Sequence, residues 1–417
     1  MTAILNTVAG ILAAVLFSLY TPSSALASVY SVSSDTALAV ALAKAESGDT
    51  LVLESGRYTG PLILKHPVIL KGNPGAVIDG RGLGHVLVVD APDVVIEGLN
   101  IENSGELLSE EHSGVFVTAA GDRAVIRGNH FRHNLIGIYL KGPDHALVQN
   151  NEITGRKDLR MNERGNGVQL WNTPGSVVEG NTIRYGRDGI FSTTSKNNRF
   201  SKNHFSDLRF AVHYMYTNNS EISDNVSEQN HVGFALMYSS HLKVLNNLSR
   251  GDRDRGIFFN FTNQSEIRNN RVDGGVEKCA FVYNSNINQI IKNHFEGCMI
   301  GFHFTAGSEQ NEIWGNNFIA NRTQVKYVGT RELEWSNGEQ GNYWSDNLAF
   351  DLNGDRIADK PYRPNTIVDQ ILWRYPNAKV LLNSPALQLL QWAQSRFPAL
   401  HPGGVRDSLP LMQPNSL

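Results

Sequence analysis

The chain has 417 residues, of which 41% are hydrophobic and 18% are charged, so it can form a sizeable core and is not globally disordered. The 37 basic and 40 acidic residues give a formal net charge of −3, which argues against a nucleic-acid-binding protein or a polybasic membrane anchor. The 38 glycines and the many asparagines indicate numerous tight turns.

Residues 1–27 read as a signal peptide. An apolar run from Val8 to Tyr20 precedes Ala25-Leu26-Ala27, a pattern typical of signal-peptidase cleavage. The run is short for a membrane span, although an uncleaved anchor is the alternative. No later segment is long and apolar enough to cross a bilayer. We therefore expect an exported protein.

The next segment, "SSDTALAVALAKAESGD", predicts a helix with Ser34 or Asp35 as its N-cap. It is followed by short strand-like segments, "TLVLESGRY", "PLILKHPVILKG", "AVIDG", "HVLVVD" and "VVIEGLNI". A short amphipathic helix can cover the open edge of a repetitive β-structure. We expect this helix to cap the strands after it.

A repeat of the form apolar-x-x-Asn-x-apolar then runs through most of the chain. Its asparagines are Asn129, Asn151, Asn181, Asn203, Asn225, Asn247, Asn270, Asn293 and Asn316. They are spaced by about 22–23 residues, except for one gap that includes an insertion around residues 155–166. Asparagines stacked one rung apart can bond to each other and to turn backbone, and asparagine tolerates left-handed turn geometry. They are therefore interpreted as scaffold.

A period of this length, with short strands and Asn/Gly turns, predicts an all-β fold, a right-handed parallel β-helix with three strands per rung. We assign residues 28–330 to the β-helix and residues 331–417 to a C-terminal extension.

Each rung also has a small residue that starts a strand, such as Gly137, Gly189, Ala211 and Gly233. Residues one and three positions later are nearly all apolar and should point inward, so those two and four positions later should point outward. The outward set holds no carboxylate, which argues against a glycoside hydrolase or a calcium-dependent lyase on this face. The face is instead rich in aromatic, methionine and histidine side chains, which is typical of a binding surface, unless a loop or the C-terminal tail covers it.

On this face His213 and Met215 lie on one strand, and Met237 should stack about 5 Å from Met215. Thioether and imidazole ligands suit Cu(I), so these three residues form a candidate copper site. The alternative is that they are contacts in a protein interface. His303 is on the same face, but four rungs away. The expected partner face comprises Trp171, Phe191, Phe258, Phe281, Tyr283 and His303.

The two cysteines, Cys279 and Cys298, are about one rung apart but three residues out of register. A bend in the chain could allow a disulfide. A disulfide, buried thiols and metal ligands are the possibilities, in that order.

In the C-terminal extension, Asp351, Asn353, Asp355 and Asp359 have the spacing of a calcium loop, but Tyr362 stands where a bidentate Glu belongs. Calcium is therefore one possibility, and a turn held by the Asx side chains is the other. Beyond the loop, Ser384 is the expected N-cap of an amphipathic helix with Leu387, Leu390 and Phe397 on its apolar face, which either caps the last rung or docks on a partner. The tail after it is expected to be mobile.

The combination of the "ALAKAESGDTLVLESGRYTGPLIL" segment, the Asn-marked rungs and the "GNYWSD…DLNGDRIADKPYRP" ending resembles the NosD family. Arg356 and Ala358 stand where that ending usually has glycine. The resemblance implies a periplasmic, non-enzymatic protein that helps to mature nitrous oxide reductase. It implies an ABC transporter permease and ATPase, a copper chaperone lipoprotein and apo-nitrous oxide reductase as partners, with copper or sulfur as the cargo.

Two classes of function therefore remain. One is an accessory protein that handles copper on a transporter. The other is a carbohydrate-binding or polysaccharide-degrading β-helix, because residues such as Trp171 and Tyr283 could stack on sugars.

Overall fold

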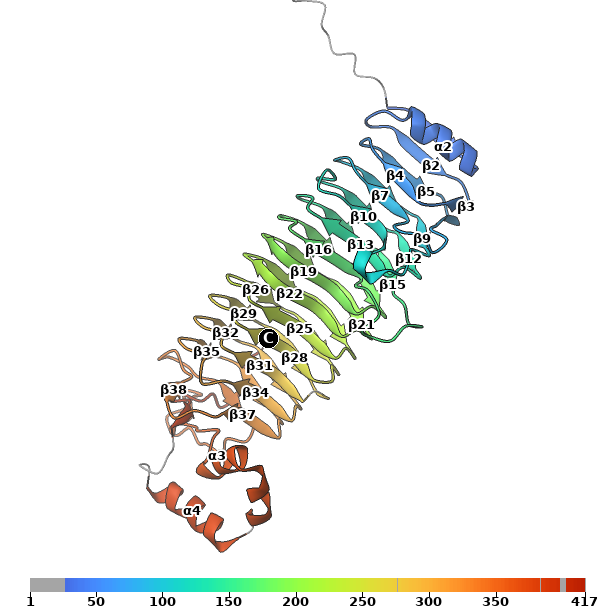
Figure 1. Ribbon diagram of the computed structural model, residues 1–417. Helices are drawn as coiled ribbons and strands as arrows, with labels where there is room; N and C mark the ends of the chain where they lie inside the picture. The colour runs from blue at the N-terminus through green and yellow to red at the C-terminus, as the bar shows by residue number, and fades with distance from the viewer. Residues whose placement is uncertain (1–26, 276, 383, 398–402, 417) are drawn as a thin grey trace, which may run out of the picture.

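The computed structural model describes residues 27–416 apart from 276, 383 and 398–402. The predicted signal peptide lies almost entirely outside the described residues. The rest is an all-β parallel β-helix of about 14 turns with about 23 residues per turn, as predicted (Figure 1). Three long parallel sheets of 13, 12 and 13 strands run the length of the rod.

Each rung contributes one strand to each of the three sheets. The first sheet contains β1 (Val29–Val32), β2 (Thr50–Leu53), β5 (Ile69–Gly72), β8 (Val95–Glu97), β11 (Val125–Arg127), β14 (Leu147–Gln149), β17 (Val177–Glu179), β20 (Arg199–Ser201), β23 (Glu221–Ser223), β26 (Lys243–Leu245), β29 (Glu266–Arg268), β32 (Gln289–Ile291) and β35 (Glu312–Trp314). The second contains β4 (Leu62–Leu64), β7 (Leu87–Val89), β10 (Ser113–Val117), β13 (Ile136–Lys141), β16 (Val168–Trp171), β19 (Asp188–Lys196), β22 (Phe210–Asn218), β25 (Val232–Met237), β28 (Arg255–Asn260), β31 (Lys278–Tyr283), β34 (Ile300–Phe304) and β37 (Thr323–Tyr327). The third contains β3 (Gly56–Thr59), β6 (Ala76–Asp79), β9 (Asn100–Glu102), β12 (His130–Arg132), β15 (Glu152–Thr154), β18 (Thr182–Arg184), β21 (His204–Ser206), β24 (Val226–Glu228), β27 (Leu248–Arg250), β30 (Arg271–Asp273), β33 (His294–Glu296), β36 (Asn317–Ile319) and β39 (Tyr343–Trp344). A separate pair joins β38 (Glu332–Glu334) to β40 (Gly404–Arg406).

The helices lie at the two ends and on one side loop. They are α2 (Asp35–Lys44), the 3-10 turns η1 (Leu108–Glu110) and η2 (Pro376–Leu381), α3 (Ile367–Arg374) and α4 (Pro385–Arg396). Helix α2 caps the first rung as predicted. The Ser34 hydroxyl accepts from the Ala37 N–H, and Leu38 and Ala41 are buried against the core.

The repeated asparagines form a continuous buried ladder between the first and third sheets. The side-chain oxygen of Asn225 accepts from both the backbone N–H and the side-chain amide of Asn203, at 2.9 and 3.0 Å. Its own amide donates to the Phe200 carbonyl and to Asn247, each at 2.9 Å. The scaffold interpretation is therefore confirmed.

The left-handed backbone, however, belongs to the residue before each ladder asparagine. Lys202, Asp224 and Asn246 have φ of +56°, +57° and +56°, and Gly128 and Gly180 hold the same position in other rungs. The ladder asparagine supplies the hydrogen bonds, while its predecessor makes the turn.

The C-terminal tail closes the far end of the ladder. The carboxylate of Asp407 accepts from the Asn342 N–H and the Trp344 indole N–H, each at 2.7 Å, and Asn342 in turn continues the ladder beyond Asn316. Burial raises the pKa of Asp407 to about 6. Because Val405 and Asp407 are buried and β40 pairs with β38, the prediction of a mobile tail was wrong for its described part.

Candidate metal site on the outer face of the second sheet

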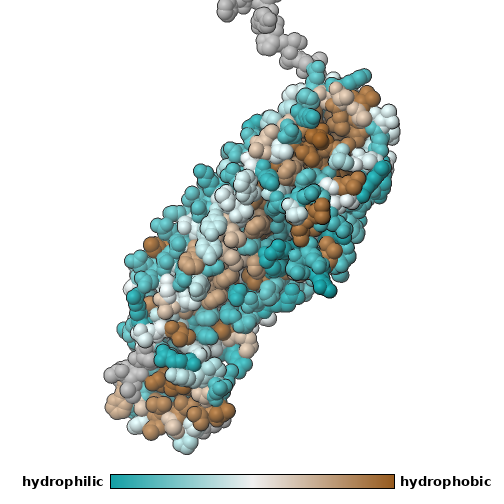
Figure 2. Space-filling view, in the orientation of Figure 1, coloured by the Kyte–Doolittle hydropathy of each residue, from teal (hydrophilic) through white to brown (hydrophobic). Residues whose placement is uncertain are grey.

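Two columns of side chains run along the outer face of the second sheet. The first column stacks Ile63, Val88, Phe116, Tyr139, Gln169, Phe191, His213, Ala235, Phe258, Phe281, His303 and Lys326 in register. The second stacks Lys141, Trp171, Thr193, Met215, Met237, Asn260 and Tyr283. Figure 2 shows this band of apolar and neutral surface between hydrophilic borders. The predicted inward residues, such as Val212 and Tyr214, are fully buried, so the predicted orientation is confirmed.

The loop that contains η1 covers this face at the rungs of Tyr139 and Gln169. The Glu111 carboxylate of that loop accepts from the Gln169 side chain at 2.8 Å, and both Tyr139 and Gln169 are buried. The predicted alternative of a covering loop is therefore correct for these rungs. Farther along, from Phe191 to Lys326, all but two first-column side chains are partly exposed.

His213 is one of the two buried side chains in this part of the first column, and it is 7% exposed. Its ring lies between Phe191 and Phe210, with centroids 5.0 and 4.9 Å away. Its Nδ1 is 3.0 Å from a carboxylate oxygen of Asp188, and the same carboxylate forms a two-bond ion pair with Arg209 at 2.8 and 2.6 Å. His213 therefore belongs to a buried Arg–Asp–His chain.

Asp188 corrects the expectation of a face without carboxylates. It is fully buried at the start of β19, directly before Gly189. Burial alone would raise the pKa of Asp188, but the hydrogen bonds from His213 and Arg209 hold it below its usual value. The sequence signal was the Asp188-Gly189 pair with Arg209 one rung later. Strict in/out alternation hid it, because it placed Asp188 on the inner side.

The carboxylate fixes the tautomer of His213. An ionised carboxylate can only accept, so Nδ1 carries a proton, and in the neutral tautomer that this bond selects the lone pair is on Nε2. That Nε2 atom is buried and has no hydrogen-bond partner. A histidine whose other nitrogen donates to a carboxylate is the usual arrangement of a metal-ligating imidazole.

Met215 and Met237 complete the predicted set. Both are half-buried in the second column and are paired in register on β22 and β25, so their backbones lie about 4.8 Å apart. Met215 follows His213 by two residues on the same face, about 6.6 Å along the strand. Flexible thioether side chains can span such gaps. The structure thus places all three predicted residues together, with Asp188 behind the histidine.

His303 is not part of this site. It lies four register steps from His213 and stacks on Phe281 with centroids 4.6 Å apart. Burial and the nearby Lys326 lower the pKa of His303 to about 4, so its ring is neutral at physiological pH. Its buried Nδ1 also lacks a partner, but Met215 and Met237 of the second column lie three or more register steps away.

The predicted partner face lies outward as expected. Trp171 and Tyr283 are exposed, while Phe191, Phe258, Phe281 and His303 are half-buried. The structure adds a third column that the sequence did not reveal, in which Tyr216, Tyr238 and Phe261 are exposed. Each has a φ near +50°, a conformation that bulky residues rarely adopt, so their projection could not be inferred from alternation.

The stacking of these rings bears on carbohydrate binding. Tyr216, Tyr238 and Phe261 stack along the rod with centroids 5.3 and 5.2 Å apart, and Phe258 stacks on Phe281 at 5.3 Å. Within these two stacks, neighbouring rings therefore cover one another's faces. A sugar platform requires free ring faces, so the stacked rings are poor candidates for one, whereas Trp171 is exposed outside these stacks.

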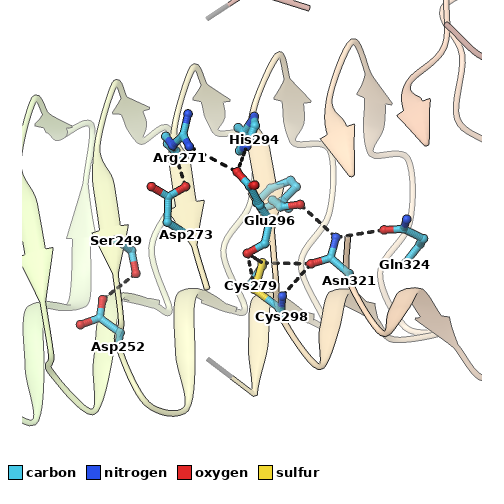
Figure 3. The surroundings of a disulfide bond; sticks show 11 residues. Ser249, Asp252, Arg271, Asp273, Cys279, His294, Glu296, Cys298, Asn321 and Gln324 are labelled. Atoms are coloured by element: carbon cyan, nitrogen blue, oxygen red, sulfur yellow. Dashed lines mark hydrogen bonds and ion pairs between the residues drawn. A yellow bond between two sulfur atoms is a disulfide. The ribbon is translucent and has the colours of Figure 1, made fainter. Parts of the chain in front are cut away.

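Cys279 and Cys298 form a disulfide, with Cα atoms 5.7 Å apart, inside the core (Figure 3). The offset in register is closed by the corner before β34, where Cys298 turns towards the start of β31. The first of the three predicted possibilities is confirmed, and these sulfurs are not free to bind metal.

One further cluster of potential ligands appears in the described part of the chain. The ligand atoms of Asp273, His294 and Glu296 lie within 4.8 Å of one another on the third sheet. Arg271 already forms ion pairs with both carboxylates, as Figure 3 shows, so the cluster is an ion-pair network.

In the predicted calcium loop, the side-chain oxygens accept from the loop's own backbone. Asp351 accepts from the N–H groups of Gly354 and Arg356, and Asp359 accepts from Leu352. These bonds support the Asx-turn interpretation. Calcium binding by this loop stays a prediction.

Comparisons with known proteins found similar sequences. A family model described as "Periplasmic copper-binding protein (NosD)" matches residues 149–349. A "Probable ABC transporter binding protein NosD" from Stutzerimonas stutzeri is 38% identical over 375 residues, covering 87% of this chain and 86% of that protein. A protein with the same name from Pseudomonas aeruginosa is 41% identical over 399 residues, covering 90% and 93%.

Solved structures show similarity in fold alone. A Family 28 exopolygalacturonase from Yersinia enterocolitica has a TM-score of 0.54 at 10% identity, covering 73% of this chain and 77% of that one. A DFA-IIIase from Arthrobacter chlorophenolicus has a TM-score of 0.54 at 13% identity, covering 76% and 98%. Within the described residues, no helix is long and apolar enough to cross a membrane.

Proposed function

Because the chain belongs to the NosD family of periplasmic copper-binding proteins, we propose that it is a non-catalytic periplasmic subunit that holds Cu(I) transiently at His213, Met215 and Met237. The observation that carries the proposal is the buried Nε2 of His213, which has no hydrogen-bond partner and belongs to a ring held by Asp188 on the strand that also carries Met215.

The chemistry of these ligands suits a cargo ion. Two thioethers and a neutral imidazole match the soft Cu(I) ion and provide no negative charge in direct contact with it. The Asp188–Arg209 pair is neutral overall, so the site gains no strong charge that would trap the ion. Because Nε2 is buried, a side chain that covers it must move for the ion to bind or leave.

The proposed partners are those that the family resemblance suggests. We propose that the protein works with the permease and ATPase of an ABC transporter, receives copper from a chaperone lipoprotein and passes it to apo-nitrous oxide reductase. Trp171 and Tyr283 lie exposed in the same column as Met215 and Met237, which makes this column the proposed contact surface for the copper-donating and copper-accepting proteins. Sulfur remains the alternative cargo, although thioether ligands favour copper.

The proposal is tested by replacing the chromosomal gene with a His213→Ala/Met215→Ala/Met237→Ala variant. We expect the variant to accumulate normally in the periplasm, while nitrous oxide reductase purified from the strain has lost most of its copper. A His231→Ala/Met299→Ala variant is the matched control, because its histidine and methionine are exposed and lie outside the site. Full copper loading in the site variant would contradict the proposal.

A further inference from the structure

A helical hairpin projects from the C-terminal end of the rod (Figure 1). It consists of α3, η2 and α4. The Asn365 side chain donates to the Val325 carbonyl at 2.7 Å, which ties the base of α3 to the last rung. Helix α4 packs on α3, where Leu387 is buried and the Gln394 side chain accepts from the Ile367 N–H at 3.1 Å. Helix α4 is the amphipathic helix that the sequence predicted, with Ser384 as its N-cap. Its buried side packs on α3 and does not cap the last rung.

The outer surface of this hairpin is unusually apolar, and Figure 2 shows hydrophobic side chains gathered at this end of the molecule. Val380 is 88% exposed and Leu389 is 62% exposed. The other exposed large apolar side chains are Tyr375, Leu381, Leu382, Leu390, Trp392 and Phe397. By contrast, few side chains of the hairpin, among them Val368 and Leu387, are buried. The segment therefore exposes far more apolar surface than its own packing requires.

The charges of the hairpin are asymmetric. Residues 366–397 contain three cations, Arg374, Lys379 and Arg396, and one anion, Asp369. Asp369 is used in the capping box of α3, where it accepts from the Thr366 N–H and hydroxyl. The exposed charge beside the apolar residues is therefore positive.

From this placement, we propose that the hairpin binds the surface of a lipid bilayer rich in anionic phospholipid. The exposed apolar side chains lie on and around η2 and α4 at the projecting end of the molecule, and the three basic residues are interspersed among them in the sequence. A bilayer interface accepts such a protrusion, with leucine and valine among the acyl chains and Arg or Lys at the headgroups. Neither α3 nor α4 is long enough to span the membrane, so the hairpin lies within the interface.

The consequence is a defined orientation of the protein. The C-terminal end of the rod rests against the membrane, and the His213 face, many rungs away, stays accessible to periplasmic proteins. This inference is independent of the copper site: the outcome of the membrane-binding test does not decide whether the protein binds copper, and the copper tests do not decide whether it binds a membrane.

The test is flotation of the mature full-length protein with vesicles in a density gradient. We expect it to float with vesicles that contain phosphatidylglycerol. At low salt the preference over pure phosphatidylcholine vesicles should be about 30-fold, because each of the two net positive charges contributes about 1 kcal/mol. A Val380→Glu/Leu381→Glu/Leu389→Glu variant should lose flotation by about 100-fold or more.

An Ile63→Glu/Leu83→Glu/Leu107→Glu variant is the matched control, because these exposed apolar residues lie at the other end of the rod and should not affect flotation. Circular dichroism checks that both variants keep the β-helix. Absence of flotation in the wild type, or equal flotation of the Val380 variant, would overturn the proposal. Binding only to vesicles that contain the permease would overturn it too, in favour of protein docking.

Discussion

We expect Asn225→Ala to lower the free energy of unfolding by about 4 kcal/mol. The substitution leaves the buried Asn203 N–H and the Phe200 carbonyl without partners and removes the amide contact to Asn247. Each buried group left unsatisfied costs about 1–3 kcal/mol. Urea unfolding followed by circular dichroism measures the total loss.

The effect should also be local, because each rung of a β-helix contacts only its neighbours. Hydrogen exchange is therefore expected to speed up first around Asn203 and Asn247. The matched control is Asn218→Ala, an exposed asparagine that accepts one bond, from the Ser240 N–H, and should cost less than about 1 kcal/mol. A loss of stability no larger for Asn225→Ala than for Asn218→Ala would show that the ladder is not the main support of the rungs.

The second large effect concerns copper. We expect His213→Ala to weaken Cu(I) binding at least about 100-fold, because it removes a direct ligand, whereas loss of a residue that only orients a ligand costs about 10–100-fold. Asp188→Asn should weaken Cu(I) binding by about 10–100-fold, because Asp188 only orients His213. An Asn side chain can present its amide to Nδ1, and the proton then moves to Nε2, where it blocks the lone pair. Anaerobic titration against a competing Cu(I) chelator gives the affinities.

His303→Ala is the control for this series, since His303 lies on the same face but outside the site. It should leave the affinity unchanged. If it lowers the affinity as much as His213→Ala does, the face binds copper through scattered histidines.

Much of the fold could be predicted from the sequence because each rung of a β-helix pairs only with the rungs next to it along the chain. The spacing of the asparagines predicted the rungs, and alternation from Gly189 and Ala211 predicted which way Val212 and His213 point. Both kinds of information lie within one or two rungs of the chain.

Features that depend on turns or on distant contacts could not be predicted in this way. Asp188 lies at a corner, where alternation fails, so the carboxylate behind His213 was missed. The rings of Tyr216 and Tyr238 project from left-handed residues, which no apolar pattern indicates. Asp407 reaches Asn342 across 65 residues, a pairing that only the folded chain displays.

The same distinction applies to the candidate site. His213, Met215 and Met237 could be found from strand register alone, so the sequence was sufficient to suggest copper. The structural evidence that strengthens this hypothesis, the fixed tautomer and the partnerless Nε2, depends on Asp188 and Arg209, whose positions follow from the folded rungs.

X-ray absorption spectroscopy of the mature protein loaded anaerobically with one equivalent of Cu(I) tests the proposed copper site most directly. We predict copper that survives removal of excess metal, bound by two thioether sulfurs and one imidazole nitrogen, with the sulfur signal lost in Met215→Ala/Met237→Ala. Copper that washes away, or a nitrogen-only shell unchanged in that variant, would contradict the proposed site and leave the face of the second sheet as a protein interface.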